Sequence, residues 1–302
     1  MIRRLTILLL LSFSLCAHAE HLFEIGLRGG IAGWNAKSVY VDQRVGFHGG
    51  AQIGYTYISP YVIGVHTGLT IDNRHAGFGK KYYKDNYSTI DVDNQQMDIN
   101  YTIMNIKEQY SIWSVGVPLQ LAFSWKNISL LAGPKVVFLP FANSWKQTVD
   151  STMLSVYYPD YDNEVIQSYP LATHRGAAEL KGQLFLPKMQ WWLSMELNYA
   201  IPLTSSPMRY QSYLIVGAYF DYCLSKMTGL ESKQESLMML TDTRDGFPLE
   251  RIFTPIMEAN RQGEKLVGAC HLLDVGIKVS YAIAPYSKRR QSSYPCRCIK
   301  DN

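Results

Sequence analysis

Apolar residues occupy every second position from Trp113 to Trp125 in the segment Tyr110–Trp125. Every odd position from Trp113 to Trp125 is apolar, whereas the even positions from Ser114 to Ser124 are small or uncharged. A period of two predicts a β-strand with one apolar face. The second face of a strand in a soluble sandwich is expected to carry charges, and this one has none.

The two tryptophans that end the apolar face are spaced for a lipid bilayer. They are twelve residue steps apart, which corresponds to about 40 Å of extended strand. A strand tilted by about 45° then rises roughly 30 Å, which is close to the thickness of the hydrocarbon layer. Aromatic residues at both edges of such a span are typical of membrane barrels. A long strand in a soluble barrel is the alternative that this segment leaves open.

Seven further segments repeat the alternation and bring the number of candidate strands to eight. They lie at 23–32, 45–57, 61–71, 128–138, 189–199, 214–222 and 273–281. The connections are short at 58–60, around 126 and at 202–209, and long at 33–43, 73–107, 142–187 and 225–269. Short turns at one end and long loops at the other are typical of outer-membrane barrels. We therefore predict an all-β fold: a transmembrane, antiparallel, up-and-down barrel of eight strands with long external loops.

The long loops contain further patterns. Segment 176–186 also alternates, so a barrel of ten strands is the alternative. Segments 235–240 and 249–263 have helical patterns, with Gly263 as a stop signal, so the last loop is expected to be partly helical. The acidic segment Tyr157–Glu164 offers oxygen ligands for calcium, but it lacks the glycine and spacing of a calcium loop, which favours a solvated tip.

The first residues of the chain have the features of a secretory signal. A basic head is followed by an apolar run over 5–15 and by the small-x-small sequence Ala17–Ala19. The run is shorter than the roughly 20 residues of a membrane-spanning helix. Cys16 would make the protein a lipoprotein, but bulky Leu15 precedes it, which favours cleavage after Ala19.

We therefore divide the chain into a signal peptide at 1–19, an outer-membrane barrel at 20–286 and a periplasmic tail at 287–302. An even number of strands places both ends of the barrel on the periplasmic side. The tail contains Cys296 and Cys298, to which the sequence assigns no role.

The composition agrees with a membrane barrel and gives no support for nucleic-acid binding. The chain is 47% hydrophobic and only 18% charged, and the apolar residues are spread over short segments. Loss of residues 1–19 removes two arginines and no acid, which lowers the net charge from +4 to +2. So small a charge does not indicate a nucleic-acid partner. The predicted partners are outer-membrane lipid and an extracellular ligand or envelope protein that the sequence does not identify.

The faces opposite the apolar ones should point into the barrel lumen, and they carry equal numbers of bases and acids. The predicted lumen charge network is Glu24, Arg28, Arg44, Lys135, Glu196, Asp221, Asp274 and Lys278. An eight-stranded barrel is only wide enough for its own side chains, and buried charges persist when they are paired. We therefore predict a closed lumen, which disfavours a diffusion porin. The predicted aromatic girdle on the outer face is Trp113, Trp125, Tyr199 and Tyr281.

No sequence feature indicates an enzyme. The chain contains no Gly-x-Ser-x-Gly, His-Glu-x-x-His or phosphate-binding motif. His48 and His66 should also point inward, where hydrogen bonding is favoured over a metal or catalytic role. A lipid-modifying enzyme would need polar groups on the outer face, which is apolar. We expect no catalytic residue, cofactor or metal.

Cys223 and Cys270 are a candidate disulfide. Cys223 has the parity of Asp221 and Cys270 that of Asp274, so both should point inward at the external rim. Neighbouring inward positions on antiparallel strands bring Cβ atoms within about 4–5.5 Å, which a disulfide requires, and the compartment is oxidising. We predict that a bond joins them at the base of the largest loop; two free thiols out of register are the alternative.

Three segments resemble a known family. They are "EIGLRGG" at 24–30, "VGVPLQLAF" at 115–123 and "LLAGPKVVF" at 130–138, and they are similar to the PorT-like outer-membrane β-barrel domain proteins. The chain departs from that family in its two longest loops and in its cysteine-containing tail. Some members are linked to protein export, so the resemblance implies an export accessory as one function. The pattern of the residues favours a non-enzymatic barrel whose external loops serve binding or surface integrity, and a lipid-modifying enzyme is the third alternative.

Overall fold

A computed structural model places most of the chain. It describes residues 20–59, 62–90, 95–141, 143–159, 163–165, 178–184, 186–203, 210–227, 236–241, 250–262 and 264–285. The predicted signal peptide, the periplasmic tail, and residues 160–162 of the acidic segment lie outside the described residues.

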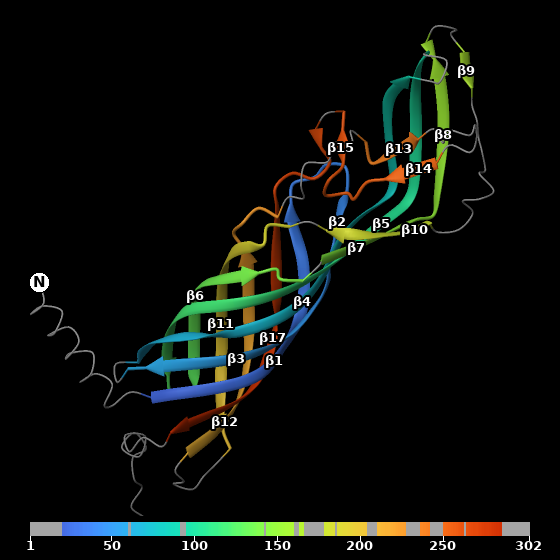
Figure 1. Ribbon diagram of the computed structural model, residues 1–302. Helices are drawn as coiled ribbons and strands as arrows, with labels where there is room; N and C mark the ends of the chain where they lie inside the picture. Colours follow the sequence, from blue (N-terminus) through green and yellow to red (C-terminus); the bar gives the residue numbers. More distant parts are fainter. Residues whose placement is uncertain are drawn as a thin grey trace, which may run out of the picture.

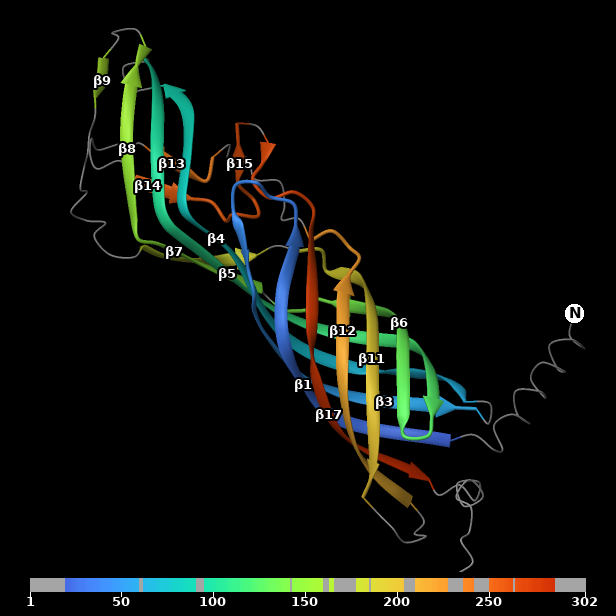
Figure 2. The ribbon, with the colours of Figure 1, turned by 180° about the vertical axis from the view of Figure 1, so that it is seen from behind.

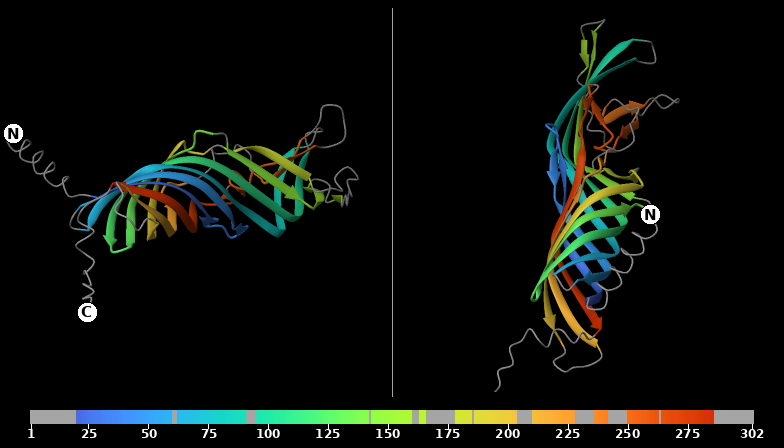
Figure 3. Two further views of the ribbon diagram at one scale, coloured as in Figure 1. Left: turned by 90° about the horizontal axis from the view of Figure 1, so that it is seen from below. Right: turned by 90° about the vertical axis from the view of Figure 1, so that its left-hand side faces the viewer.

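Eight antiparallel strands pair into a ring (Figures 1 and 3). They are β1 (Glu20–Ala36), β3 (Gly46–Ile58), β4 (Ile63–Ile90), β5 (Gln96–Trp125), β6 (Ile128–Phe138), β11 (Met189–Pro202), β12 (Tyr210–Cys223) and β17 (Cys270–Pro285). Each strand pairs with the next ring strand along the chain, and β17 pairs back to β1. The predicted all-β antiparallel fold is confirmed, and the described residues form a ring of eight strands.

The strands β4 and β5 continue far beyond the ring as one long hairpin (Figures 1 and 2). They remain paired as far as Ile90 and Gln96. The hairpin is widened by β2 (Asp42–Arg44), β7 (Asn143–Val149), β8 (Ser151–Tyr158), β9 (Asn163–Val165) and β10 (Ala178–Leu184). The prediction of a loop at 73–107 is therefore wrong. The alternating segment 176–186 forms β10, but β10 pairs with β7 outside the ring, so it does not raise the ring to ten strands.

The last long connection contains short strands where helices were predicted. Strand β13 (Met238–Thr241) pairs with β14 (Glu250–Phe253), and β15 (Asn260–Arg261) pairs with β16 (Glu264–Lys265). Pro255 prevents one helix from running through 249–263, because proline lacks the amide proton and clashes with the preceding turn. Gly263 lies outside the described residues. Among the residues that the structure covers, no helix is long and apolar enough to cross a membrane.

The ring is apolar outside and polar inside. Leu27, Leu121 and Ile277 are each at least 65% exposed on the outer face. The four residues predicted as an aromatic girdle, Trp113, Trp125, Tyr199 and Tyr281, also lie on this face and are 45–61% exposed. The lumen is filled instead by charged and amide side chains. This distribution is the reverse of that in a soluble protein.

The wide end of the ring is closed by an apolar cluster. Trp34, Phe78 and Tyr110 from the strands pack there with apolar side chains of the last connection. Leu237 and Ile256 of the last connection are fully buried in this cluster. An apolar cluster therefore adjoins the polar lumen at this end of the ring.

Candidate functional site

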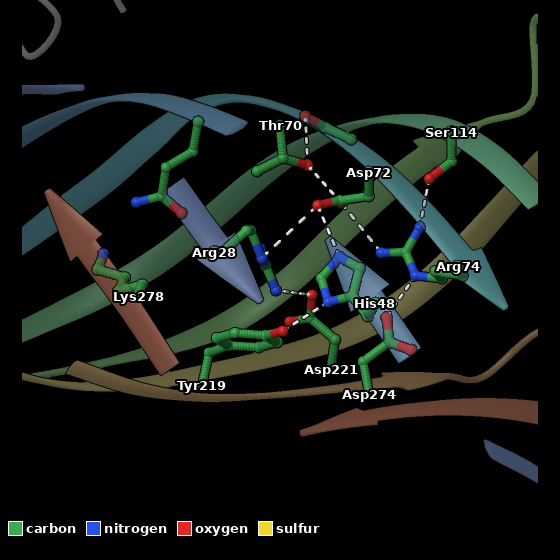
Figure 4. Close-up of polar contacts among 12 residues, drawn as sticks. Arg28, His48, Thr70, Asp72, Arg74, Ser114, Tyr219, Asp221, Asp274 and Lys278 are labelled. Atoms are coloured by element: carbon green, nitrogen blue, oxygen red, sulfur yellow. Dashed lines mark hydrogen bonds and ion pairs between the residues drawn. The ribbon is translucent and has the colours of Figure 1, made fainter. Parts of the chain in front are cut away.

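Asp72 of β4 lies at the centre of the polar lumen (Figure 4). Its Oδ1 accepts a hydrogen bond from His48 Nε2 at 3.0 Å and lies 3.6 Å from Arg28 Nε. Its Oδ2 accepts from Arg74 Nη2 at 3.0 Å and from Lys135 Nζ at 3.2 Å. One carboxylate therefore joins three cations and a histidine that come from β1, β3, β4 and β6.

Two carboxylates from β12 and β17 complete this group. Asp221 Oδ2 accepts hydrogen bonds from Arg28 Nη2 at 2.6 Å and from Lys135 Nζ at 3.1 Å. Asp274 accepts one from Arg74 Nε. We call Arg28, Arg74, Lys135, Asp72, Asp221 and Asp274 the central cluster; all six are buried. It contains three cations and three carboxylates, so its charge is balanced within hydrogen-bonding distance.

A second cluster lies along the lumen from the first. Lys278 Nζ donates to Glu24 Oε1 at 3.2 Å and also to Glu196. Gln52 Nε2 donates to the same Glu24 oxygen at 2.9 Å, and His66 Nε2 lies 4.0 Å from it. Together the two clusters fill the bore with paired side chains.

Seven of the eight residues predicted for the lumen charge network are buried inside the ring, and Arg44 is not. Arg44 belongs to β2 and is exposed on the outer surface. Four residue steps separate Arg44 from His48, but only three separate their partners Gly77 and Arg74 on β4. The extra residue is a β-bulge near Val45, and a shift of one residue turns the side chain to the other face.

The sequence prediction missed Asp72 and Arg74, the residues that tie the central cluster together. Arg74 falls in the segment 73–107 that was predicted as a loop, and Asp72 directly follows the predicted strand 61–71. The signal was nevertheless present, because Thr70, Asp72 and Arg74 continue the even parity of His66, and β4 does not end at Ile71. The even positions of β4 therefore continue to face the lumen beyond Ile71, even though the residues there are charged.

The two lumenal histidines are hydrogen-bonded to neighbouring side chains. His48 Nδ1 lies 2.5 Å from the Tyr219 hydroxyl, and His66 Nδ1 lies 2.8 Å from Thr56 Oγ1. Arg28 stacks on Tyr219, with 4.0 Å between the guanidinium carbon and the ring centroid. In the described part of the chain, no three His, Cys, Asp or Glu side chains are grouped so that they would hold a metal ion.

The disulfide predicted between Cys223 and Cys270 is not formed. Both are buried free thiols. Tyr222 pairs with Leu273 in the β12–β17 ladder, so the next position, Cys223, comes level with Leu272 and not with Cys270. The parity predicted for both residues is correct. The register between β12 and β17 differs from the predicted one by two residues.

A third polar group lies above the lumen, inside the apolar cluster that closes the mouth. The Glu108 carboxylate accepts hydrogen bonds from the Ile256 backbone amide at 2.9 and 3.0 Å and from Gln147 Nε2 at 2.6 Å. The Tyr110 hydroxyl also donates to Glu108. Glu108 lies on β5 beyond Trp113, outside the apolar belt. Through its hydrogen bonds to Ile256, Glu108 links the last connection to strand β5 of the hairpin.

Burial raises the pKa of Glu108 to about 7. The hydrogen bonds from Tyr110, Ile256 and Gln147 act in the opposite direction, and the charge of Glu258 adds to the increase. Among the described residues no cation forms an ion pair with Glu108. A carboxyl group that titrates near neutral pH therefore holds the closing segment.

Comparison with known proteins gives only distant similarities. No family model matches the chain, and no curated protein sequence matches it. One similar solved structure is Ail, the attachment invasion locus protein of Yersinia pestis, in complex with the heparin analogue sucrose octasulfate. It has 12% identity, and the match covers 87% of this chain and 99% of that chain with a TM-score of 0.28. Another is Neisserial surface protein A, with 7% identity, 87% and 97% coverage and a TM-score of 0.26. Both TM-scores are below 0.5, so the description of the fold rests on the strand pairing.

Proposed function

We propose that this protein is a non-enzymatic outer-membrane β-barrel with a closed lumen, whose external hairpin and loops serve binding or surface integrity. The observation that carries the proposal is the reversed distribution of side chains: an apolar outer belt around a lumen of paired charges. An apolar outside is stable in lipid and would be an aggregation hazard in water. The secretory signal expected at 1–19 agrees with export to this membrane.

The external location of the hairpin follows from the same proposal. The short connections of the ring lie at one end, and the β4–β5 hairpin with its added strands lies at the other. In bacterial barrels the short turns are periplasmic and the long connections are extracellular. The sheet around β4 and β5 would then stand outside the cell as a rigid platform.

The resemblance to the PorT-like family stays a part of the proposal. All three segments that carry it lie in ring strands, namely β1, β5 and β6. The export accessory that this resemblance implies would act through the periplasmic turns and tail.

Deletion of the hairpin tip at 84–102 separates the two functions, because it should abolish surface binding and leave export unchanged.

The location is tested by fractionation and a heat-shift gel. We expect the protein in the outer-membrane fraction, with Glu20 as its first residue, and we expect the unheated band to migrate differently from the boiled one, because folded barrels resist detergent. Recovery in the soluble periplasm, or a band that does not shift, would contradict the proposal.

The closed lumen predicts an absence of conductance. Purified protein in a planar bilayer should show no stable channel, because the two charge clusters and the apolar cluster block the bore. A large porin inserted under the same conditions is the positive control. Steady openings of porin size would show that the lumen is open.

A further inference from the structure

Two adjoining hollows lie on the outer surface just beyond the ring, where β2, β4, β5 and β7 meet. Their volumes are about 560 and 300 Å³, and Arg44 and Lys107 line both. Gly79 lines the first hollow and Gly77 the second. Gly79 lies beneath the Arg44 side chain, because a Cβ at this position would be 3.0 Å from Arg44 Cδ. We call the two hollows together the rim groove.

The rim groove is strongly basic. Its cationic lining residues are Arg44, Lys80, Lys81, Lys107 and Lys146. The exposed acids are Asp42, which pairs with Lys80 at 3.1 Å, and Asp150, which accepts a hydrogen bond from Asn105 at 2.6 Å. The buried Glu108 also lines the second hollow, so five cations against three acids leave an excess of two positive charges. Arg44, Lys81 and Lys107 make no ion pair with any acid that the structure describes.

The rim groove is continuous with the apolar belt. Arg44 is followed directly by Val45, which also lines the groove, and then by Phe47 two residues further, and both apolar side chains are exposed. On β5, Lys107 has the same outward parity as Trp113 and precedes it by six residues. Six residues of strand span about 20 Å, or roughly 14 Å along the membrane normal at a tilt near 45°. Lys107 therefore lies outside the aromatic edge of the belt, on the side from which lipid headgroups and their sugars project.

We propose that the rim groove binds the phosphorylated headgroup of an outer-leaflet lipid, whose acyl chains lie on the belt below. This inference rests on the proposed outer-membrane location. A ligand that contacts both Val45 and Phe47 and the cations above them must be apolar at one end and anionic at the other. A surplus of two positive charges over a groove of this size fits a glycolipid with two phosphates better than a lipid with one. The bulge that turns Arg44 outward is what places a guanidinium, which binds phosphate through two hydrogen bonds, at the lower edge of the groove.

The test uses full-length mature protein in zwitterionic detergent and native mass spectrometry. The probes are a bisphosphorylated lipid A, its monophosphorylated form, a zwitterionic phospholipid and inorganic pyrophosphate. We expect the order of affinity bisphosphorylated, monophosphorylated, zwitterionic, with binding of the first weakened by salt. Pyrophosphate should not compete at equal concentration, because it lacks the apolar part.

Matched variants assign the binding to the groove. Arg44→Gln/Lys81→Gln/Lys107→Gln should bind the bisphosphorylated lipid roughly 100-fold more weakly, because each cation near a membrane surface contributes about a factor of five. The control Lys84→Gln/Lys226→Gln/Lys265→Gln removes the same charge from exposed sites outside the groove and should bind like the parent. All six positions are exposed, so we expect both variants to show the heat shift of the parent.

Three results would overturn the proposal: equal affinity of the parent for all lipids, equal weakening in both variants, or competition by pyrophosphate as effective as that by lipid. The salt dependence and the lipid order are measured on the parent alone, so the test does not depend on the folding of a variant. If the parent is found in the membrane with a heat shift but shows no lipid preference, only this inference fails. If the parent is soluble and unshifted, the proposed function fails as well.

Discussion

Replacement of Asp72 by alanine is expected to lower the free energy of unfolding by about 3–5 kcal/mol, the range found when one partner of a buried ion pair is removed. Asp72 is fully buried and contacts Arg28, Arg74 and Lys135. Its loss leaves the central cluster with three cations and two carboxylates. The surplus charge is buried, because the side chains of Arg28, Arg74 and Lys135 are at most 1% exposed. Urea titration of the folded protein in detergent micelles, followed by tryptophan fluorescence, measures the change.

The matched control is Asp42→Ala. The Asp42 side chain is 72% exposed and pairs with Lys80 at 3.1 Å. An exposed ion pair contributes no more than about 1 kcal/mol, so this variant should unfold nearly as the parent does. Asp72→Asn keeps the size of the side chain and should fall between the parent and Asp72→Ala. If Asp72→Ala and Asp42→Ala have the same effect, the central cluster does not stabilise the barrel.

Closure of the mouth by the segment around Ile256 is expected to weaken as the pH rises from about 4.5 to 7. The pKa of Glu108 is raised from 4.5 to about 7 in the closed state, so the closed state binds a proton that the open state releases. Stability that depends on this proton is fully present below pH 4.5 and lost by pH 7 and above. Two to three pKa units correspond to roughly 3 kcal/mol.

Hydrogen exchange of the Ile256 and Met257 amides measures this effect. After correction for the intrinsic exchange rates, protection at pH 5 should exceed that at pH 8 by about two orders of magnitude. Glu108→Gln is nearly isosteric and stays neutral, so its protection should be independent of pH. Amides of β12 in the ring serve as the internal reference. An unchanged pH dependence in Glu108→Gln would assign the effect to another group, such as Glu258.

Much of the ring could be predicted from the sequence because the information is local. Alternation tells which face of a strand is apolar without reference to its neighbours, as in the segment from Trp113 to Trp125. The same parity placed Glu24, Asp221 and Lys278 inside. It would also have placed Asp72 inside if β4 had been extended past Ile71.

Other features were decided only by the tertiary structure, because they depend on how strands that are distant in sequence are aligned. A single bulge near Val45 moved Arg44 from the lumen to the rim groove, and a register offset of two residues separated Cys223 from Cys270. Residues Glu250–Phe253 formed a strand with Met238–Thr241 as the pairing partner, although the local pattern resembled a helix. The sequence by itself determined the two faces of each ring strand. The alignment between strands, and with it the partner of every buried charge, was decided by backbone pairing around the closed ring, where each strand must fit both of its neighbours at once.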